Sequence, residues 1–142
     1  REHAIDQKSK GFIKLKNPKK IKKVILCSGK IYFDLIEARE KLKKDDIIFF
    51  RIEQLYPFPA KALVKELRPY AKNSKFYWCQ EEPKNMGAWF SVRDYIQWTL
   101  DKIKANNNQI SYIGRSPDAS PATGYAKWHI SQQQEIVKKV FE

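Results

Sequence analysis

The chain has 142 residues, of which 42% are hydrophobic and 13% aromatic, and its formal net charge is +12. This length fits one domain, and this composition supports a packed core and argues against disorder. No apolar run approaches the roughly 18 residues of a membrane-spanning helix, and the lysine-rich N-terminus lacks the apolar core of a signal peptide.

The positive charge is concentrated near the N-terminus. Residues 1–30 contain ten Lys or Arg against two acids, whereas residues 31–142 contain eighteen against fourteen. We therefore divide the chain into a basic arm or linker, residues 1–23, and a folded domain, residues 24–142. A solvated linker explains the arm better than a nucleic-acid-binding face does. The RNA-binding alternative predicts binding that falls steeply with salt and is lost when residues 1–23 are removed.

Strand-like and helix-like patterns alternate along the folded domain. Continuous apolar runs predict buried strands at 24–27, 47–52, 76–80 and 110–113, with a short further piece at 12–15. Helical spacing of apolar residues predicts helices at 31–42, 59–70, 86–104 and 127–141. The core face of the first is expected to carry Ile31, Leu35, Ala38 and Leu42, and that of the third Trp89, Val92, Ile96, Leu100 and Ile103. Such alternation predicts a three-layer α/β/α fold around a mostly parallel sheet.

The turn Ser28-Gly29-Lys30 is a candidate anion or effector site. It connects a strand to a helix, where free backbone N–H groups and the helix dipole favour anions. It lacks the spacing of a phosphate-binding P-loop, so an ordinary connecting turn remains the alternative.

Three turns follow consecutive strands and are expected at the same edge of the sheet. They are residues 28–30, 54–59 and 81–87. Large apolar residues lie there beside polar ones, a composition expected of a surface that contacts a partner. The candidate interface residues are Tyr56, Pro57, Phe58, Gln80, Glu82, Asn85 and Trp89. Core packing is the alternative for the aromatic members, most of all for Trp89; we expect Phe58→Ala to leave the domain's own stability nearly unchanged.

No catalytic constellation is apparent in the sequence. Adjacent acids in an extended segment point to opposite sides, so Glu81 and Glu82 are not expected to form an acid/base dyad. His3 and His129 have no partners at metal-ligand spacing, and residues 116–124 do not form a nucleophile elbow. Cys27 and Cys79 are interpreted as small buried hydrophobic residues. We therefore assign no catalytic, cofactor-binding or metal-binding residue.

Three blocks carry a family resemblance. They read VILCSGKIY from residue 24, RIEQLYPFP from 51 together with WCQEEPKNMGAW from 78, and YIGRSPDASPATGYAKWHISQQ from 112. In this order they resemble the C-terminal part of the thiamine-diphosphate-dependent first component of 2-oxoglutarate dehydrogenase, across about residues 20–142. The resemblance implies a transketolase C-terminal-like fold. Its five-stranded mixed sheet would contain one antiparallel strand, for which residues 12–15 are the candidate.

The resemblance also implies an activity for the complete enzyme. That enzyme decarboxylates 2-oxoglutarate with thiamine diphosphate and magnesium and passes the succinyl group to a lipoyl arm in the tricarboxylic acid cycle. The partners it implies are the remaining domains of the same subunit, a homodimer mate and the dihydrolipoyl succinyltransferase component. A bacterial cytoplasm or a mitochondrial matrix is the expected location.

The chain lacks the family's diphosphate motif, a Gly-Asp-Gly run followed by Asn. We therefore expect this domain to bind no cofactor, to be inactive alone and to serve assembly. The alternative is a regulatory module that binds a nucleotide or acyl-coenzyme A at the turns 28–30 and 81–87.

Overall fold

The computed structural model describes residues 17–117 and 126–142, with the backbone alone for 126–129. The strands are β1 (Lys23–Cys27), β2 (Ile47–Arg51), β3 (Lys75–Pro83) and β4 (Ile110–Arg115). The helices are α1 (Ile31–Leu42), α2 (Ala60–Leu67), α3 (Trp89–Lys102) and α4 (Ala126–Phe141), with 3-10 turns η1 (Pro18–Lys20) and η2 (Arg68–Tyr70). None of the helices in this described part is both long and apolar enough to span a membrane.

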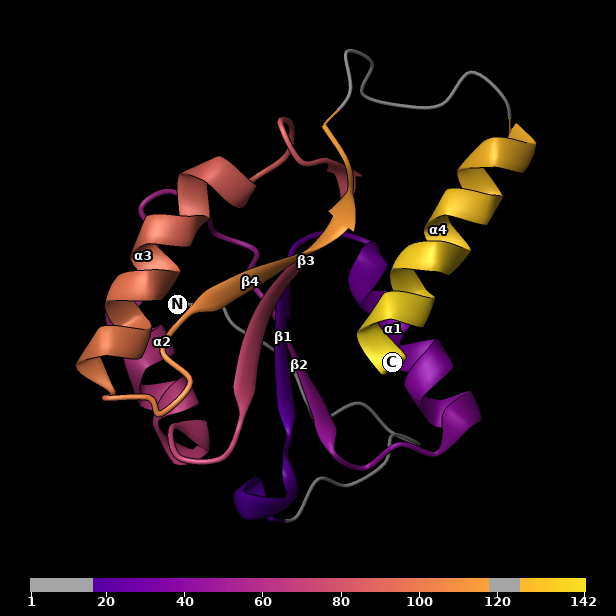
Figure 1. The fold of residues 1–142 in the computed structure, drawn as a ribbon. Helices are drawn as coiled ribbons and strands as arrows, with labels where there is room; N and C mark the ends of the chain where they lie inside the picture. The colour runs from indigo at the N-terminus through magenta and orange to yellow at the C-terminus, as the bar shows by residue number, and fades with distance from the viewer. Residues whose placement is uncertain (1–16, 118–125) are drawn as a thin grey trace.

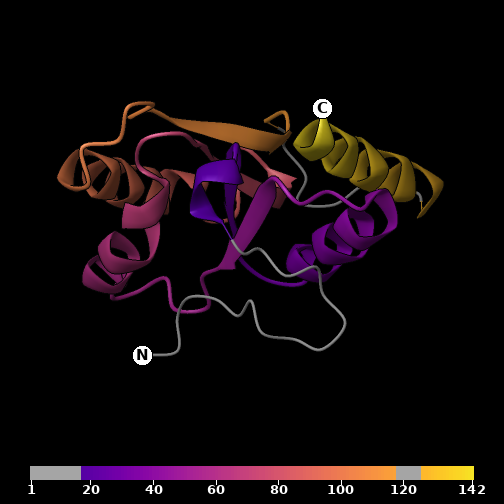
Figure 2. The same ribbon diagram turned by 90° about the horizontal axis from the view of Figure 1, so that it is seen from below.

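The described strands form one parallel sheet in the order β2-β1-β3-β4. Helices α2 and α3 cover one face, while α1 and α4 cover the other, which Figures 1 and 2 show from two directions. The predicted three-layer α/β/α fold is confirmed. The expected additional strand at 12–15 lies outside the described residues.

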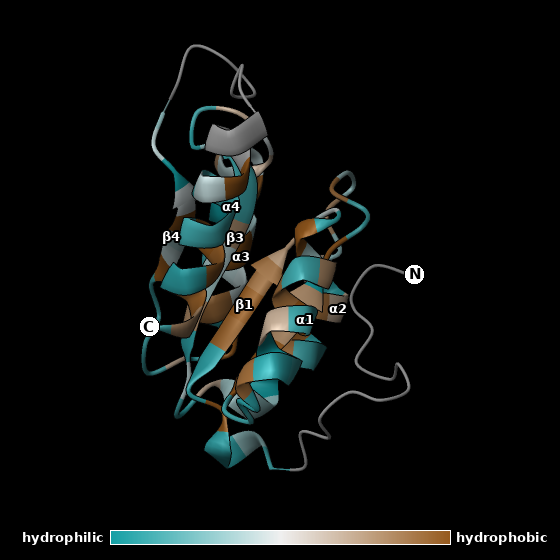
Figure 3. Cartoon of the chain, turned by 90° about the vertical axis from the view of Figure 1, so that its right-hand side faces the viewer, coloured by the Kyte–Doolittle hydropathy of each residue, from teal (hydrophilic) through white to brown (hydrophobic). Residues whose placement is uncertain are grey.

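Side chains alternate between two cores because successive strand residues point to opposite faces. In β1, Val24 and Leu26 pack beneath α2 and α3, whereas Ile25 and Cys27 pack beneath α1 and α4. This burial on both faces explains the unbroken apolar run in the sequence. Figure 3 shows β1 mostly in the hydrophobic colour, whereas α1 and α4 carry both hydrophilic and hydrophobic residues.

Helix boundaries differ from the expected ones by a few residues. Pro59 precedes α2 instead of beginning it, and α3 starts at Trp89 because residues 84–88 form a turn. The five expected core residues of the third helix are all buried. The placement of Leu42 in the core was wrong: its side chain is 54% exposed. Leu42 is the last residue of α1, beyond the part of the helix that lies on the sheet, and Lys43 then ends the helix in the left-handed conformation.

The two cysteines lie opposite each other on neighbouring strands of the sheet and form no disulfide. Cys27 and Cys79 lie opposite each other on β1 and β3, and both are free thiols in the core beneath α1 and α4. This confirms their interpretation as buried hydrophobic residues. Burial raises the pKa of both thiols, that of Cys79 to about 12, with a smaller contribution from the nearby Glu81 and Glu82 carboxylates.

Candidate functional site

Three turns meet at the carboxyl edge of the sheet, as their order in the sequence predicts. Because β1, β2 and β3 are parallel, the segments that follow them emerge at the same edge. A cavity of about 490 Å³ lies between them. It is lined by Ser28 and Gly29 after β1, Tyr56 after β2, Glu82 near the end of β3 and Gly87 in the turn that follows. This is the candidate site, and we call it the edge cavity.

The floor of the edge cavity is organised by the buried amide of Gln80. Its Oε1 accepts hydrogen bonds from Trp78 Nε1 and from the backbone N–H of Trp89, both at 3.0 Å. Its Nε2 donates to the carbonyl oxygens of Glu82, Pro83 and Met86 at 3.2, 2.9 and 2.7 Å. One side chain therefore joins the end of β3, the following turn and the beginning of α3.

Gly87 allows this turn to close around Gln80. Its φ of +68° lies in the left-handed region, which favours glycine. A Cβ at this position would also lie 3.1 Å from Gln80 Oε1 and 3.0 Å from Glu82 Oε2. The glycine is therefore needed both for the backbone conformation and for the close approach of these two side chains.

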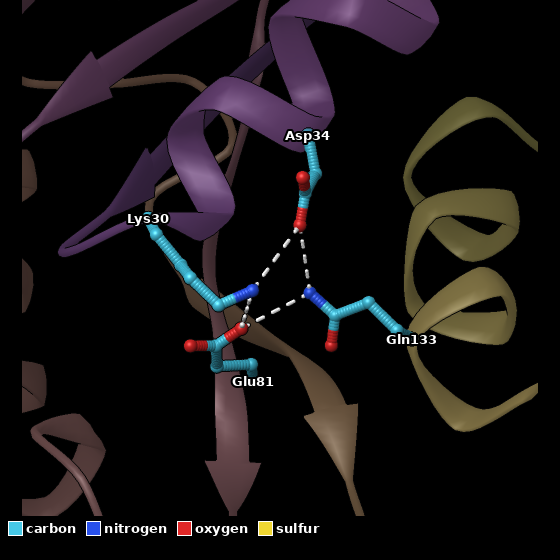
Figure 4. Close-up of polar contacts among 4 residues, drawn as sticks. All are labelled: Lys30, Asp34, Glu81 and Gln133. Atoms are coloured by element: carbon cyan, nitrogen blue, oxygen red, sulfur yellow. Dashed lines mark hydrogen bonds and ion pairs between the residues drawn. The ribbon is translucent and has the colours of Figure 1, made fainter. Parts of the chain in front are cut away.

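Glu81 and Glu82 diverge, as expected for neighbours in an extended strand. Glu81 Oε2 lies 3.5 Å from Lys30 Nζ and accepts a hydrogen bond from Gln133 Nε2 at 3.1 Å. Asp34 contacts the same two groups at 3.8 and 3.1 Å, so the four side chains form one network between α1, β3 and α4 (Figure 4). Glu82 instead faces Gly87 and the edge cavity.

The three residues of the candidate anion site lie in different surroundings. Ser28 and Gly29 line the edge cavity, whereas Lys30 directs its ammonium group toward Glu81 and Asp34 on the other side of the sheet. An anion at the start of α1 would therefore meet a lysine that two carboxylates already neutralise in part. A second cavity of about 510 Å³ lies between α1 and α4, with Lys30 and Gln133 in its wall.

Some of the candidate interface residues are exposed at the surface, whereas others are buried beneath it. Tyr56 is 90% exposed, and Pro57, Glu82 and Asn85 are also exposed. Gln80 and Trp89 are buried and hold the turn from within the domain. These two contribute to the surface only by shaping it.

Phe58 lies between the surface and the core. Its ring stacks on Tyr95 with centroids 5.1 Å apart and planes 12° apart, and it packs against the core beneath α2 and α3. These contacts favour the core-packing alternative and argue against the expectation that Phe58→Ala leaves the domain's own stability nearly unchanged. A lone aromatic residue between two prolines gives no signal of a stacking partner almost forty residues away.

Other exposed aromatic residues gather at the same edge. Phe33 lies in the first turn of α1 and Phe90 in the first turn of α3, and both are at least half exposed. The guanidinium of Arg51 lies 5.0 Å from the Phe33 ring centroid and 5.2 Å from that of Tyr32. Arg51 Nε also pairs with Glu53 Oε1 at 2.6 Å.

The described residues hold no group of three or more His, Cys, Asp or Glu side chains that could ligate a metal. The ring of Tyr112 packs against that of Trp89, with centroids 5.4 Å apart. Burial raises the pKa of its phenol to about 12, and the hydroxyl donates to the carbonyl oxygen of Arg115 at 2.8 Å. A phenol held in its neutral form is a structural anchor rather than a base.

Several site residues were missed by sequence reasoning. Asp34 and Gln133 complete the network around Lys30, and Ser91 and Tyr95 line the edge cavity. A signal was available for the latter pair, since residues 87, 91 and 95 recur at the spacing of one helix face. No comparable signal links Gln133 to Glu81, because their contact depends on how α4 packs against the sheet.

The chain matches a family model described as 2-oxoglutarate dehydrogenase C-terminal over residues 2–141. It belongs to this family. The 2-oxoglutarate dehydrogenase E1 component of Brucella abortus is 52% identical over 125 residues, which are 88% of this chain. That of Brucella anthropi is 52% identical over 120 residues, or 84% of the chain. The chain spans 12% of the length of each of these relatives.

The fold has a counterpart among solved structures. A protein described as a split gene transketolase, inactive beta4 tetramer, aligns with a TM-score of 0.51 over 84% of this chain and 38% of its own. Sequence identity is only 12%, so this match bears on the fold alone. It agrees with the transketolase C-terminal-like fold that the sequence resemblance implied.

Proposed function

We propose that this chain is the C-terminal assembly domain of a 2-oxoglutarate dehydrogenase E1 component. The observation that carries the proposal is the carboxyl edge of the sheet, where Tyr56 is 90% exposed and Phe33 and Phe90 are at least half exposed. Exposed aromatic side chains at one edge of a domain are typical of a protein contact surface. The greater part of each relative's length lies outside this chain and supplies a partner for that surface.

The complete enzyme would decarboxylate 2-oxoglutarate and transfer the succinyl group to a lipoyl arm in the tricarboxylic acid cycle. Thiamine diphosphate and magnesium would be held by its other domains. The described residues of this chain do not fit them, since they offer neither a metal-binding cluster nor a diphosphate motif. This domain's contribution is to position those domains without supplying a catalytic group.

The partners in this proposal are the other domains of the subunit, a homodimer mate and the dihydrolipoyl succinyltransferase component. The corresponding location is the cytoplasm of a bacterium or a mitochondrial matrix. Turnover of 2-oxoglutarate by the isolated chain, supplied with thiamine diphosphate and magnesium, would contradict its non-catalytic role.

Substitution of Tyr56 in the intact enzyme tests the docking role. Since the side chain is almost fully exposed in the domain, Tyr56→Ala should leave the fold intact. It should accelerate amide hydrogen exchange in residues 54–58 without changing exchange in β1. The matched control is Leu42→Ala, which removes another exposed hydrophobic side chain at the opposite edge of the sheet. Equal exchange in the two variants and the wild type would mean that nothing docks on the carboxyl edge.

A second candidate function is binding of a nucleotide or acyl-coenzyme A effector. It is favoured by the edge cavity, whose volume suits a small ligand and whose wall contains Ser28 and Gly29. The pairing of Lys30 with two carboxylates and the presence of Glu82 in the cavity weigh against an anion. Calorimetry with nucleotides and acyl-coenzymes A decides the matter. Lys30→Ala should weaken an anion bound at the start of α1 by about 1–3 kcal/mol, whereas unchanged affinity would place the ligand in the edge cavity, away from the Lys30 ammonium group.

A further inference from the structure

The buried side-chain amide of Gln80 lies in the wall of the edge cavity, and its hydrogen bonds are all made within the domain. Both atoms of the Gln80 amide are engaged, the oxygen by two donors and the nitrogen by three carbonyl oxygens. Gln80 therefore has no capacity left for an occupant. What the cavity offers a ligand comes from the groups around its rim.

The rim carries an unpaired negative charge. Among the described residues that line the cavity, Glu82 alone is charged. Its carboxylate has no hydrogen bond or ion pair within the described part of the chain, in contrast to the neighbouring Glu81 with Lys30 and Gln133. A shortage of basic residues does not explain why Glu82 is unpaired, because lysine and arginine outnumber the acids by twelve in the whole chain.

Aromatic side chains line the same cavity as this carboxylate. Tyr56 and Tyr95 line the same cavity and are 90% and 50% exposed, and Tyr95 is held in place by its stack with Phe58. Aromatic faces attract cations through their quadrupole, and a guanidinium stacks on them particularly well. A carboxylate next to such rings therefore forms a receptor for a basic side chain.

The same edge of the domain already contains such an arrangement in complete form. Arg51 lies within 5.2 Å of the rings of Tyr32 and Phe33 while it pairs with Glu53. The edge cavity repeats the two aromatic rings and the carboxylate but has no cation of its own among the described residues.

We infer that the edge cavity receives an arginine side chain from the preceding domains of the enzyme, seated against Tyr56 and Tyr95 and paired with Glu82. This inference rests on the proposed docking function and names the chemistry of the docked partner. The guanidinium supplies the charge that the rim lacks, and its flat face can stack on a tyrosine ring. Docking of the domain then depends on one desolvated ion pair as well as on apolar contact.

The test begins with Glu82→Gln in the intact enzyme, which keeps the side-chain shape and removes the charge. Loss of one partner of a desolvated charge pair should lower the protection of residues 54–58 against hydrogen exchange by roughly tenfold or more. Exchange in β1 should not change. Glu66→Gln removes the same charge from an exposed position on α2 and should have no effect.

A photoreactive phenylalanine analogue at position 56 then identifies the partner. The linked peptide should lie in the preceding domains and contain an arginine. Glu82→Arg should abolish docking. In that variant, substitution of the partner's arginine by glutamate should restore docking. A linked peptide without an arginine, or a link to residues 1–16 of this chain, overturns the inference.

The two proposals fail in distinguishable ways. If Tyr56→Ala loosens the edge while Glu82→Gln behaves like Glu66→Gln, the docking surface stands and the arginine receptor is wrong. If neither Tyr56→Ala nor Glu82→Gln alters exchange, the docking function itself is wrong.

Discussion

The side-chain nitrogen of Gln80 lies 2.7 Å from the carbonyl oxygen of Met86, and this hydrogen bond closes the turn between β3 and α3. The same nitrogen also donates hydrogen bonds to the carbonyl oxygens of Glu82 and Pro83. The turn that shapes the edge cavity thus depends on a single buried amide. A segment of the chain that looks like an exposed loop in the sequence is a fixed part of the domain.

Gln80→Glu should destabilise the domain strongly. A carboxylate would replace the donor with an oxygen that faces three carbonyl oxygens, each of which loses its partner. We expect the free energy of unfolding to fall by at least about 2 kcal/mol, measured by urea denaturation. The control is Gln134→Glu, the same change at an exposed position of α4, which should stay within about 0.5 kcal/mol of the wild type.

Lys30→Met should have a small effect on stability. Its side chain is 66% exposed, so its ion pairs with Asp34 and Glu81 are screened by solvent. We expect a loss of no more than about 1 kcal/mol, which diminishes at high salt. A loss several times larger and insensitive to salt would show that the network of Figure 4 is a buried clamp for α4.

Cys27 and Cys79 should resist alkylation in the folded protein at neutral pH. Both thiols are buried, and their raised pKa values keep them in the unreactive protonated form. Mass spectrometry of peptides should find both unlabelled by iodoacetamide until denaturant is added. Labelling of Cys79 in native protein would mean that α1 or α4 opens readily from the sheet.

The Cys79 thiol should also make stability depend on alkaline pH. Its folded-state pKa of about 12 is above the value of about 8.5 of an unfolded thiol. The folded state therefore binds this proton more tightly, and its contribution is complete below about pH 8 and declines as pH rises toward 12. Cys79→Ala should flatten the fall in the free energy of unfolding over this range; an unchanged slope would contradict the assignment.

Phe58→Ala should lower the stability of the domain itself. The substitution removes the aromatic ring, and with it the stack on Tyr95 and the contact with the core beneath α2 and α3. We expect a cost of about 1–3 kcal/mol by thermal or chemical unfolding, because the site is only partly buried. Tyr56→Ala, two residues earlier in the same turn, is the comparison that should cost little.

Much of the fold could be predicted from local patterns. The buried strands follow from unbroken apolar runs such as residues 24–27, and the core face of α3 from its spacing. The common edge of the three turns follows from parallel strand direction alone. The exposure of Leu42 could not be predicted, because periodicity does not tell where a helix leaves the sheet.

Contacts within the site were harder to predict. The sequence showed that Glu81 and Glu82 diverge, but not that Gln133 from the last helix would meet the first of them. The stack of Phe58 on Tyr95 likewise depends on the packing of α3 against the turn after β2. Such pairings arise from tertiary packing between distant segments, which no local pattern records.

The central claim is that the carboxyl edge is covered in the complete enzyme. Hydroxyl-radical footprinting of the intact enzyme, with the oxidation of each residue compared with that in denaturant, measures this directly. The account predicts strong protection of Tyr56, although it is 90% exposed in the domain, and weak protection of Leu42. Oxidation of Tyr56 in the native enzyme at close to its denatured rate would contradict it.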